Sequence, residues 1–137
     1  MSQASKRERG LLDTSVVIDL ARISPPHLPT LAAISAVTLA ELSAGPHATA
    51  DPAERARRQD RLQQVEARVD AIALDGGVAR AYGLVFAAVV AAGRKPRGPR
   101  VLDLLIAATA LAMQLPLYTR NPDDFAGLDE LIEIVVV

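Results

Sequence analysis

Four acidic side chains that could take part in catalysis lie far apart in this sequence. Each one stands just after an apolar segment or at its start. They are Asp13, Glu41, Asp103 and Asp124. Carboxylates that converge repel one another unless they are protonated or bridged by a cation. Oxygen ligands without His or Cys suit Mg²⁺ or Mn²⁺, and such an ion can activate water and stabilise charge on a phosphodiester. If the fold brings these acids together, metal-assisted hydrolysis is the chemistry they could perform.

The elements that must position these acids are short apolar strands that alternate with helices. We expect strands at 11–12, 33–37, 71–74, 115–119 and 133–137, and helices at 16–22, 38–45, from Pro52, at 78–92 and at 101–113. This alternation predicts a parallel α/β sheet with right-handed crossovers. Ligands of such sheets bind outside the carboxyl ends of the strands. The topology therefore predicts that the four acids lie near the same edge of the sheet.

Asp103 is the only charged residue in the Ala-rich and Leu-rich stretch Val101–Met113. A helix that is apolar nearly all round is usually buried, and a carboxylate beside such a core needs a cation, a hydrogen-bond partner or a function. We expect Leu104 to Met113 to be core and Asp103 to face the site.

Composition indicates one globular domain at residues 10–137, preceded by a flexible tail at residues 1–9. Half of the 137 residues are hydrophobic, and the formal net charge is −1, so nucleic-acid binding would need a local basic patch. The absence of cysteine excludes a disulfide framework and a thiolate metal site. No signal sequence and no membrane span are recognisable. We expect a soluble, cytoplasmic protein with no membrane partner.

Each acid also has a purely structural interpretation. Asp13 could cap the following helix, and Thr38-x-x-Glu41 has the form of a capping box. Asp103 could simply stabilise the first turn of its helix through the helix dipole. Asp124 could belong to an ordinary turn, because the stretch 121–124 is also a common turn sequence.

Four stretches together resemble the motifs of PIN-domain proteins, in the family's order. They are LLDTSVVIDL at 11–20, ISAVTLAEL at 34–42, DLLIAATA at 103–110 and YTRNPDDF at 118–125. The length of the chain and the residues of the four motifs are most similar to those of VapC toxins of toxin–antitoxin pairs. The family usually has Asn at the position of Ser15, and Ser keeps a short polar side chain there.

This resemblance implies a three-layer α/β/α fold with a short, mostly parallel central sheet. It also implies a Mg²⁺-dependent endoribonuclease, with Mn²⁺ as the other candidate ion, that commonly forms a homodimer and is inhibited by a VapB antitoxin. By position, Asp13, Glu41 and Asp103 match the family's acidic set. Asp124 matches the more variable fourth acid, for which Asp123 competes.

In the mechanism implied by these matches, Asp13 and Asp103 anchor Mg²⁺, and Glu41 positions or deprotonates the attacking water. Asp124 is an outer ligand or the site of a second ion. The expected products carry 5′-phosphate and 3′-hydroxyl ends.

Substrate contacts are expected from polar residues around the acids, and the RNA itself is not identified by the sequence. The basic loop Arg94–Arg100 leads to Asp103 and could guide RNA phosphates, although it could equally be a solvated loop. We assign substrate contacts to Thr14, Asn121, Arg100 and Arg120, and no catalytic role to His27 or His47. The alternative function is a non-catalytic PIN-like module that binds RNA or a protein partner.

Overall fold

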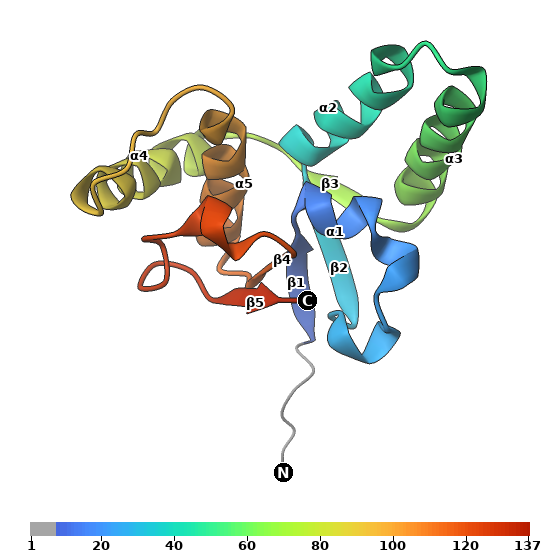
Figure 1. Ribbon diagram of the computed structural model, residues 1–137. Helices are drawn as coiled ribbons and strands as arrows, with labels where there is room; N and C mark the ends of the chain where they lie inside the picture. The colour runs from blue at the N-terminus through green and yellow to red at the C-terminus, as the bar shows by residue number, and fades with distance from the viewer. Residues whose placement is uncertain (1–7) are drawn as a thin grey trace.

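A five-stranded sheet runs through the centre of the computed structural model, which describes residues 8–137 (Figure 1). The strands are parallel and follow the order β3-β2-β1-β4-β5. Their bounds are β1 Arg9–Leu12, β2 Leu31–Ser35, β3 Asp70–Ile72, β4 Leu117–Thr119 and β5 Ile134–Val136. The predicted α/β class is confirmed, and every strand pair in the described part of the chain is parallel.

Helices cover both faces of this sheet and give three layers. Helices α4 and α5 pack side by side on one face, whereas α1 and α3 lie on the opposite side (Figure 1). The helices are α1 Thr14–Ile18, α2 Ala36–Ala44, α3 Pro52–Arg68, α4 Gly76–Ala91 and α5 Arg100–Met113. Short 3-10 segments are η1 Leu20–Arg22, η2 Pro25–His27, η3 Gly45–Ala48 and η4 Pro122–Phe125.

Strands β1 and β4, which pair with each other, divide their side chains between two hydrophobic cores. Leu11 and Leu117 face the core beneath α4 and α5, whereas the neighbouring Leu12 and Tyr118 face the core beneath α1 and α3. Successive side chains of a strand point to opposite faces. A parallel sheet covered on both faces therefore needs apolar residues at consecutive positions, and this is why its strands look like continuous apolar runs.

Helix α5 is buried over most of its length, as its apolar sequence predicts. Residues from Leu104 to Ala110 are buried except for Leu105, which is partly buried. The prediction that the core extends to Met113 is wrong, because that side chain is 42% exposed at the end of the helix. No helix within residues 8–137 is long and apolar enough to cross a membrane.

Helix α2 begins earlier than the sequence pattern indicates. The hydroxyl of Ser35 accepts the backbone N–H of Thr38 at 3.0 Å, so Ser35 is the N-cap and the helix starts at Ala36. The strand predicted at 33–37 corresponds to β2, which begins and ends two residues earlier, at Leu31 and Ser35. Thr38 lies inside the helix, and the proposed capping box of Thr38 and Glu41 is therefore wrong.

Other boundaries shift by a few residues. The expected tail at residues 1–9 falls mostly outside the described residues, but Arg9 belongs to β1 and pairs with Leu31. Leu115 donates its backbone N–H to Ala110 at the end of α5, so β4 starts two residues after the predicted 115. The expected helix 16–22 is instead α1 followed by η1.

Two glycines with opposite surroundings test this packing. A Cβ at Gly10 would lie 2.9 Å from Cδ1 of the buried Tyr118 ring, and overpacking costs about 1–3 kcal/mol. A Cβ at Gly83, inside α4, would meet nothing within 4 Å, and Ala favours a helix interior over Gly by about 0.5–1 kcal/mol.

We therefore expect Gly10→Ala to lower the free energy of unfolding in urea and Gly83→Ala to raise it. Far-UV circular dichroism measures both. An unchanged unfolding midpoint for Gly10→Ala would contradict the packing of Tyr118 against β1.

Candidate active site

Acidic side chains follow the carboxyl ends of three neighbouring strands. Asp13 comes directly after β1, Glu41 lies on the helix after β2, and Asp124 lies in η4 after β4. Asp103 occupies the first turn of α5. The order of β2, β1 and β4 in the sheet brings these elements to one edge, where the sequence predicted them.

The pKa of Asp103 shows that the other three acids lie within electrostatic range of its carboxyl group. Burial is the largest cause of a rise in the pKa of Asp103 from 3.8 to about 7. Three negative charges add to this rise, and Arg100 opposes it. In order of effect the three are Asp124, Asp13 and Glu41.

Asp13 is buried, with 3% of its surface exposed, and its carboxylate is held by two hydroxyl groups. Its Oδ2 accepts from Ser15 Oγ at 2.8 Å and from Thr119 Oγ1 at 2.9 Å. Asp13 occupies the N-cap position of α1, but its side chain makes no capping hydrogen bond. The carboxylate therefore does not cap the helix.

The same two hydroxyls also bind the backbone beyond β4. Ser15 Oγ accepts the N–H of Arg120 at 3.1 Å, and Thr119 Oγ1 accepts the N–H of Asn121 at 2.9 Å. Sequence analysis missed this role of Ser15 and Thr119. The available signal was a hydroxyl residue two positions after Asp13 and another at the end of a strand.

Glu41 is half-buried and accepts a hydrogen bond from Thr14. The Thr14 Oγ1 to Glu41 Oε1 distance is 2.6 Å, within the range of a strong bond to a carboxylate. Thr14 is the first residue of α1, so this bond joins the element after β1 to the helix after β2.

The two candidates for the fourth acid have different surroundings. Asp124 is half-buried, lines a hollow together with Asp103 and raises the pKa of Asp103. Asp123 is exposed and is not among the charges that shift Asp103. Asp124, and not Asp123, therefore lies beside Asp103.

Basic side chains share the hollow of Asp103 and Asp124. They are Lys95, Arg97 and Arg100. Of these three residues, only Arg100 was individually predicted from the sequence to contact the substrate.

The other predicted substrate residues have different surroundings. Arg120 Nε lies 3.3 Å from Asp19 Oδ2 in a half-exposed ion pair. Asn121 is exposed at the start of η4, without a side-chain capping bond. Thr14 gives its hydroxyl proton to Glu41.

The donor set of this edge fits a hard divalent cation. Its anionic groups are all carboxylates, and they lie around Asp103 with Arg100 as the opposing charge. Within residues 8–137, no three His, Asp or Glu side chains stand close enough to hold an ion by themselves. An ion here would therefore keep several water ligands, as Mg²⁺ usually does in proteins.

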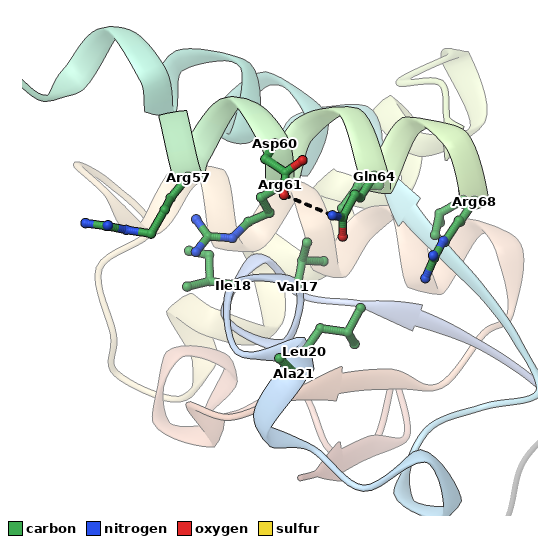
Figure 2. A pocket seen from close by; sticks show the side chains of 11 residues that line it. Val17, Ile18, Leu20, Ala21, Arg57, Asp60, Arg61, Gln64 and Arg68 are labelled. Carbon is green, nitrogen blue, oxygen red and sulfur yellow. Dashed lines mark hydrogen bonds between the residues drawn. The ribbon is translucent and has the colours of Figure 1, made fainter. Parts of the chain in front are cut away.

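A second hollow lies between α1 and α3 and shares no residue with that of Asp103 (Figure 2). Its apolar side is formed mainly by the α1–η1 segment, and its other side is lined from α3 by residues that include Arg57, Arg61 and Arg68 (Figure 2). Ile18 and Arg61 also line a neighbouring hollow that reaches Thr14 and Glu41. The lining of the second hollow includes Val17, Ile18, Leu20, Ala21, Val65 and Val69.

Comparison with known proteins identifies the family. The PIN domain matches residues 10–131. Ribonuclease VapC5 of Mycobacterium tuberculosis (strain ATCC 25618 / H37Rv) is 34% identical over 131 residues, which cover 93% of each chain.

Solved structures agree with this match. A crystal structure of VapBC-5, a member of the VapBC family of toxin–antitoxin systems from Mycobacterium tuberculosis, has a TM-score of 0.83 and 37% identity, and the alignment covers 95% of this chain and 99% of that chain. VapBC2 from Rickettsia felis shares the fold, with a TM-score of 0.72 at 21% identity over 92% of this chain and 96% of that one. With the four motifs in order and nearly the whole chain matched, this chain belongs to the PIN-domain family and is of the VapC type.

Proposed function

We propose that this chain is a Mg²⁺-dependent endoribonuclease and the toxin of a VapBC-type toxin–antitoxin pair. The observation that carries the proposal is the convergence of three carboxylates, Asp13, Glu41 and Asp124, on Asp103 at the carboxyl edge of the sheet. The sequence has no cysteine, and its two histidines lie in η2 and η3, away from these strand ends. Carboxylates are therefore the groups available for the chemistry.

In this proposal, Asp13 and Asp103 hold the ion, directly or through water, and Asp124 is an outer ligand. Bound Mg²⁺, or Mn²⁺ in its place, activates water and stabilises negative charge on the phosphodiester. The two hydroxyls on Asp13 Oδ2 leave Oδ1 of the same carboxylate for the ion. Glu41 orients the attacking water or takes its proton. Hydrolysis leaves 5′-phosphate and 3′-hydroxyl ends.

RNA is the proposed substrate, and the basic hollow supports it. Lys95, Arg97 and Arg100 stand beside Asp103 and Asp124. Cations near the acids attract phosphates locally, even though the formal net charge of the chain is −1.

The proposed antitoxin occupies the hollow between α1 and α3 (Figure 2). Its apolar side suits a hydrophobic segment, and among residues 8–137 Arg61 and Arg68 form no ion pair, so their charges are available to an acidic partner. This hollow, which we call the α1–α3 groove, shares Ile18 and Arg61 with the neighbouring hollow that reaches Glu41. A segment bound there could extend to the acids and block them.

The proposed homodimer uses the outer surface of α4 and α5. Leu84 is 59% exposed, Val90 51% and Leu102 42%. These three large apolar side chains are exposed on two helices that pack against each other, and a second copy of the chain would cover them.

The first test is cleavage of RNA by the purified chain freed of antitoxin, with Mg²⁺ present. Because Asp13 is a proposed ligand, we expect Asp13→Ala to lower the cleavage rate by at least about 100-fold, and EDTA to abolish cleavage until Mg²⁺ is restored. Gel analysis of labelled RNA measures both. Cleavage that survives both changes would overturn the mechanism, and RNA binding without cleavage would favour the non-catalytic module.

Adjacent acids in η4 provide a matched pair of variants. Asp124 lies beside Asp103 and Asp123 does not. We expect Asp124→Asn to slow cleavage by about 10-fold or more and Asp123→Asn to leave the rate within about twofold of the unchanged protein. The reverse ranking in the same assay would assign the fourth acid to Asp123.

The raised pKa of Asp103 predicts a pH-dependent gain of stability for Asp103→Asn without metal. Between pH 3.8 and about 7 the folded chain keeps a proton on Asp103 that the unfolded chain has released. The contribution of this carboxyl to the free energy of unfolding therefore decreases as the pH rises through that window. At pH values well above this window the carboxyl is ionised in both the folded and the unfolded chain, and the loss of stability is complete.

We expect Asp103→Asn to raise the thermal midpoint at pH 8 in EDTA by about 3 °C, with the gain vanishing near pH 4. Saturating Mg²⁺ should stabilise the unchanged chain more than the variant, because ligand binding stabilises the state that binds it. Differential scanning calorimetry measures these shifts. An equal gain at every pH would refute the electrostatic cause.

A further inference from the structure

Three hydroxyl groups form a continuous chain of hydrogen bonds that ends on Glu41. Ser35 Oγ lies 3.3 Å from Thr38 Oγ1, which lies 2.9 Å from Thr14 Oγ1. Thr14 Oγ1 in turn lies 2.6 Å from Glu41 Oε1. Ser35 and Thr38 are fully buried. The chain connects the N-cap of α2 to a carboxylate one and a half turns later on the same helix by way of α1.

The direction of every bond in this chain is fixed by proton count. A hydroxyl has one proton to donate, and a carboxylate oxygen only accepts. Thr14 donates to Glu41, so its contact with Thr38 must use the proton of Thr38. Ser35 then donates to Thr38 and accepts the backbone N–H of Thr38 at 3.0 Å. All three hydroxyls therefore donate toward Glu41.

We propose that Thr14 is a positioning residue for Glu41, which it holds as a hydrogen-bond acceptor in one orientation. The inference rests on the proposed function, because it assigns Thr14 a task in the same site. A carboxylate on a long, half-buried side chain has many rotamers, and the bond from Thr14 selects one of them. The bond from Thr14 engages Oε1 of Glu41, and Oε2 is the oxygen proposed to face the attacking water.

This role differs measurably from the substrate contact predicted for Thr14 from the sequence. A group that only binds RNA changes KM, whereas a group that orients a catalytic carboxylate changes kcat. The hydroxyl proton of Thr14 is already used by Glu41, which favours the second role.

The kinetic test uses the full chain with saturating Mg²⁺ and an RNA oligonucleotide that carries a cleavage site mapped on total cellular RNA. Thr14→Val removes the hydroxyl with little change in shape, and we expect it to lower kcat by about 10- to 100-fold with KM within about twofold. Thr14→Ser restores the hydroxyl and should return kcat to within about threefold of the unchanged chain.

Thr109→Val is the matched control for loss of a buried hydroxyl. Thr109 is 1% exposed and donates to the backbone oxygen of Leu105 at 2.9 Å on the apolar part of α5. We expect this variant to lose stability while kcat stays within about twofold. A raised KM with an unchanged kcat in Thr14→Val would overturn the positioning role, as would failure of Thr14→Ser to restore kcat.

A thermal double-mutant cycle provides a readout that needs neither RNA nor metal. We expect Thr14→Val to lower the midpoint in EDTA by about 4 °C. In a Glu41→Ala background the same change should lower it by less than half as much, because residues in contact are not additive. Equal losses in both backgrounds would overturn the coupling of Thr14 to Glu41.

The two tests separate the two proposals. If the unchanged chain cleaves no RNA while the thermal coupling persists, the proposed function fails and the bond between Thr14 and Glu41 stands. If RNA is cleaved while the kinetic and thermal effects of Thr14→Val match those of Thr109→Val, the proposed function stands and the positioning role fails.

Discussion

Carboxylates brought together at the edge of a sheet repel one another, and the rest of this structure has to withstand that repulsion. Asp103 shows the effect of this setting, because burial first and three neighbouring negative charges next raise the pKa of this carboxyl to about 7. Each acid comes from a different element, so the repulsion acts between elements and not within one. Packing on both faces of the sheet supplies the opposing force, through two apolar cores that share the central strands.

Polar contacts in the site have a different task from these cores. Hydroxyl groups surround the acids at three positions: Ser15 and Thr119 bind Asp13, and Thr14 binds Glu41. Hydroxyls donate hydrogen bonds without adding positive charge. They fix the direction of a carboxylate and leave its negative charge in place, whereas a Lys or Arg partner would neutralise the charge that a cation needs.

The parts of the fold that depend on local pattern could be predicted from the sequence. The parallel class and the placement of Asp13 follow from short apolar runs that end in a polar residue. Ser35 and Thr38 could each be the N-cap of the helix that follows β2. Which of the two caps the helix depends on where β2 stops pairing with β1 and β3. The pattern of side chains does not contain that information.

Contacts between distant segments could not be predicted in the same way. The bond from Thr119 to Asp13 spans 106 residues and exists because β1 pairs with β4. Asp123 and Asp124 are neighbours in a turn, and only the path of η4 distinguishes the exposed side chain from the half-buried one. The roles of these acids in catalysis stay predictions until cleavage is measured.

The bond between Asp13 and Thr119 also has a consequence for the time at which the site forms during synthesis. The first strand leaves the ribosome early, but the hydroxyl that holds its aspartate arrives only with the fourth strand. Asp103 and Asp124 belong to the same late part of the chain. A nascent chain therefore carries Asp13 and Glu41 for most of its synthesis without a complete acidic set, whereas every residue that lines the α1–α3 groove has been made by residue 69. A partner that binds this groove could thus reach the chain before the chain is able to act on RNA.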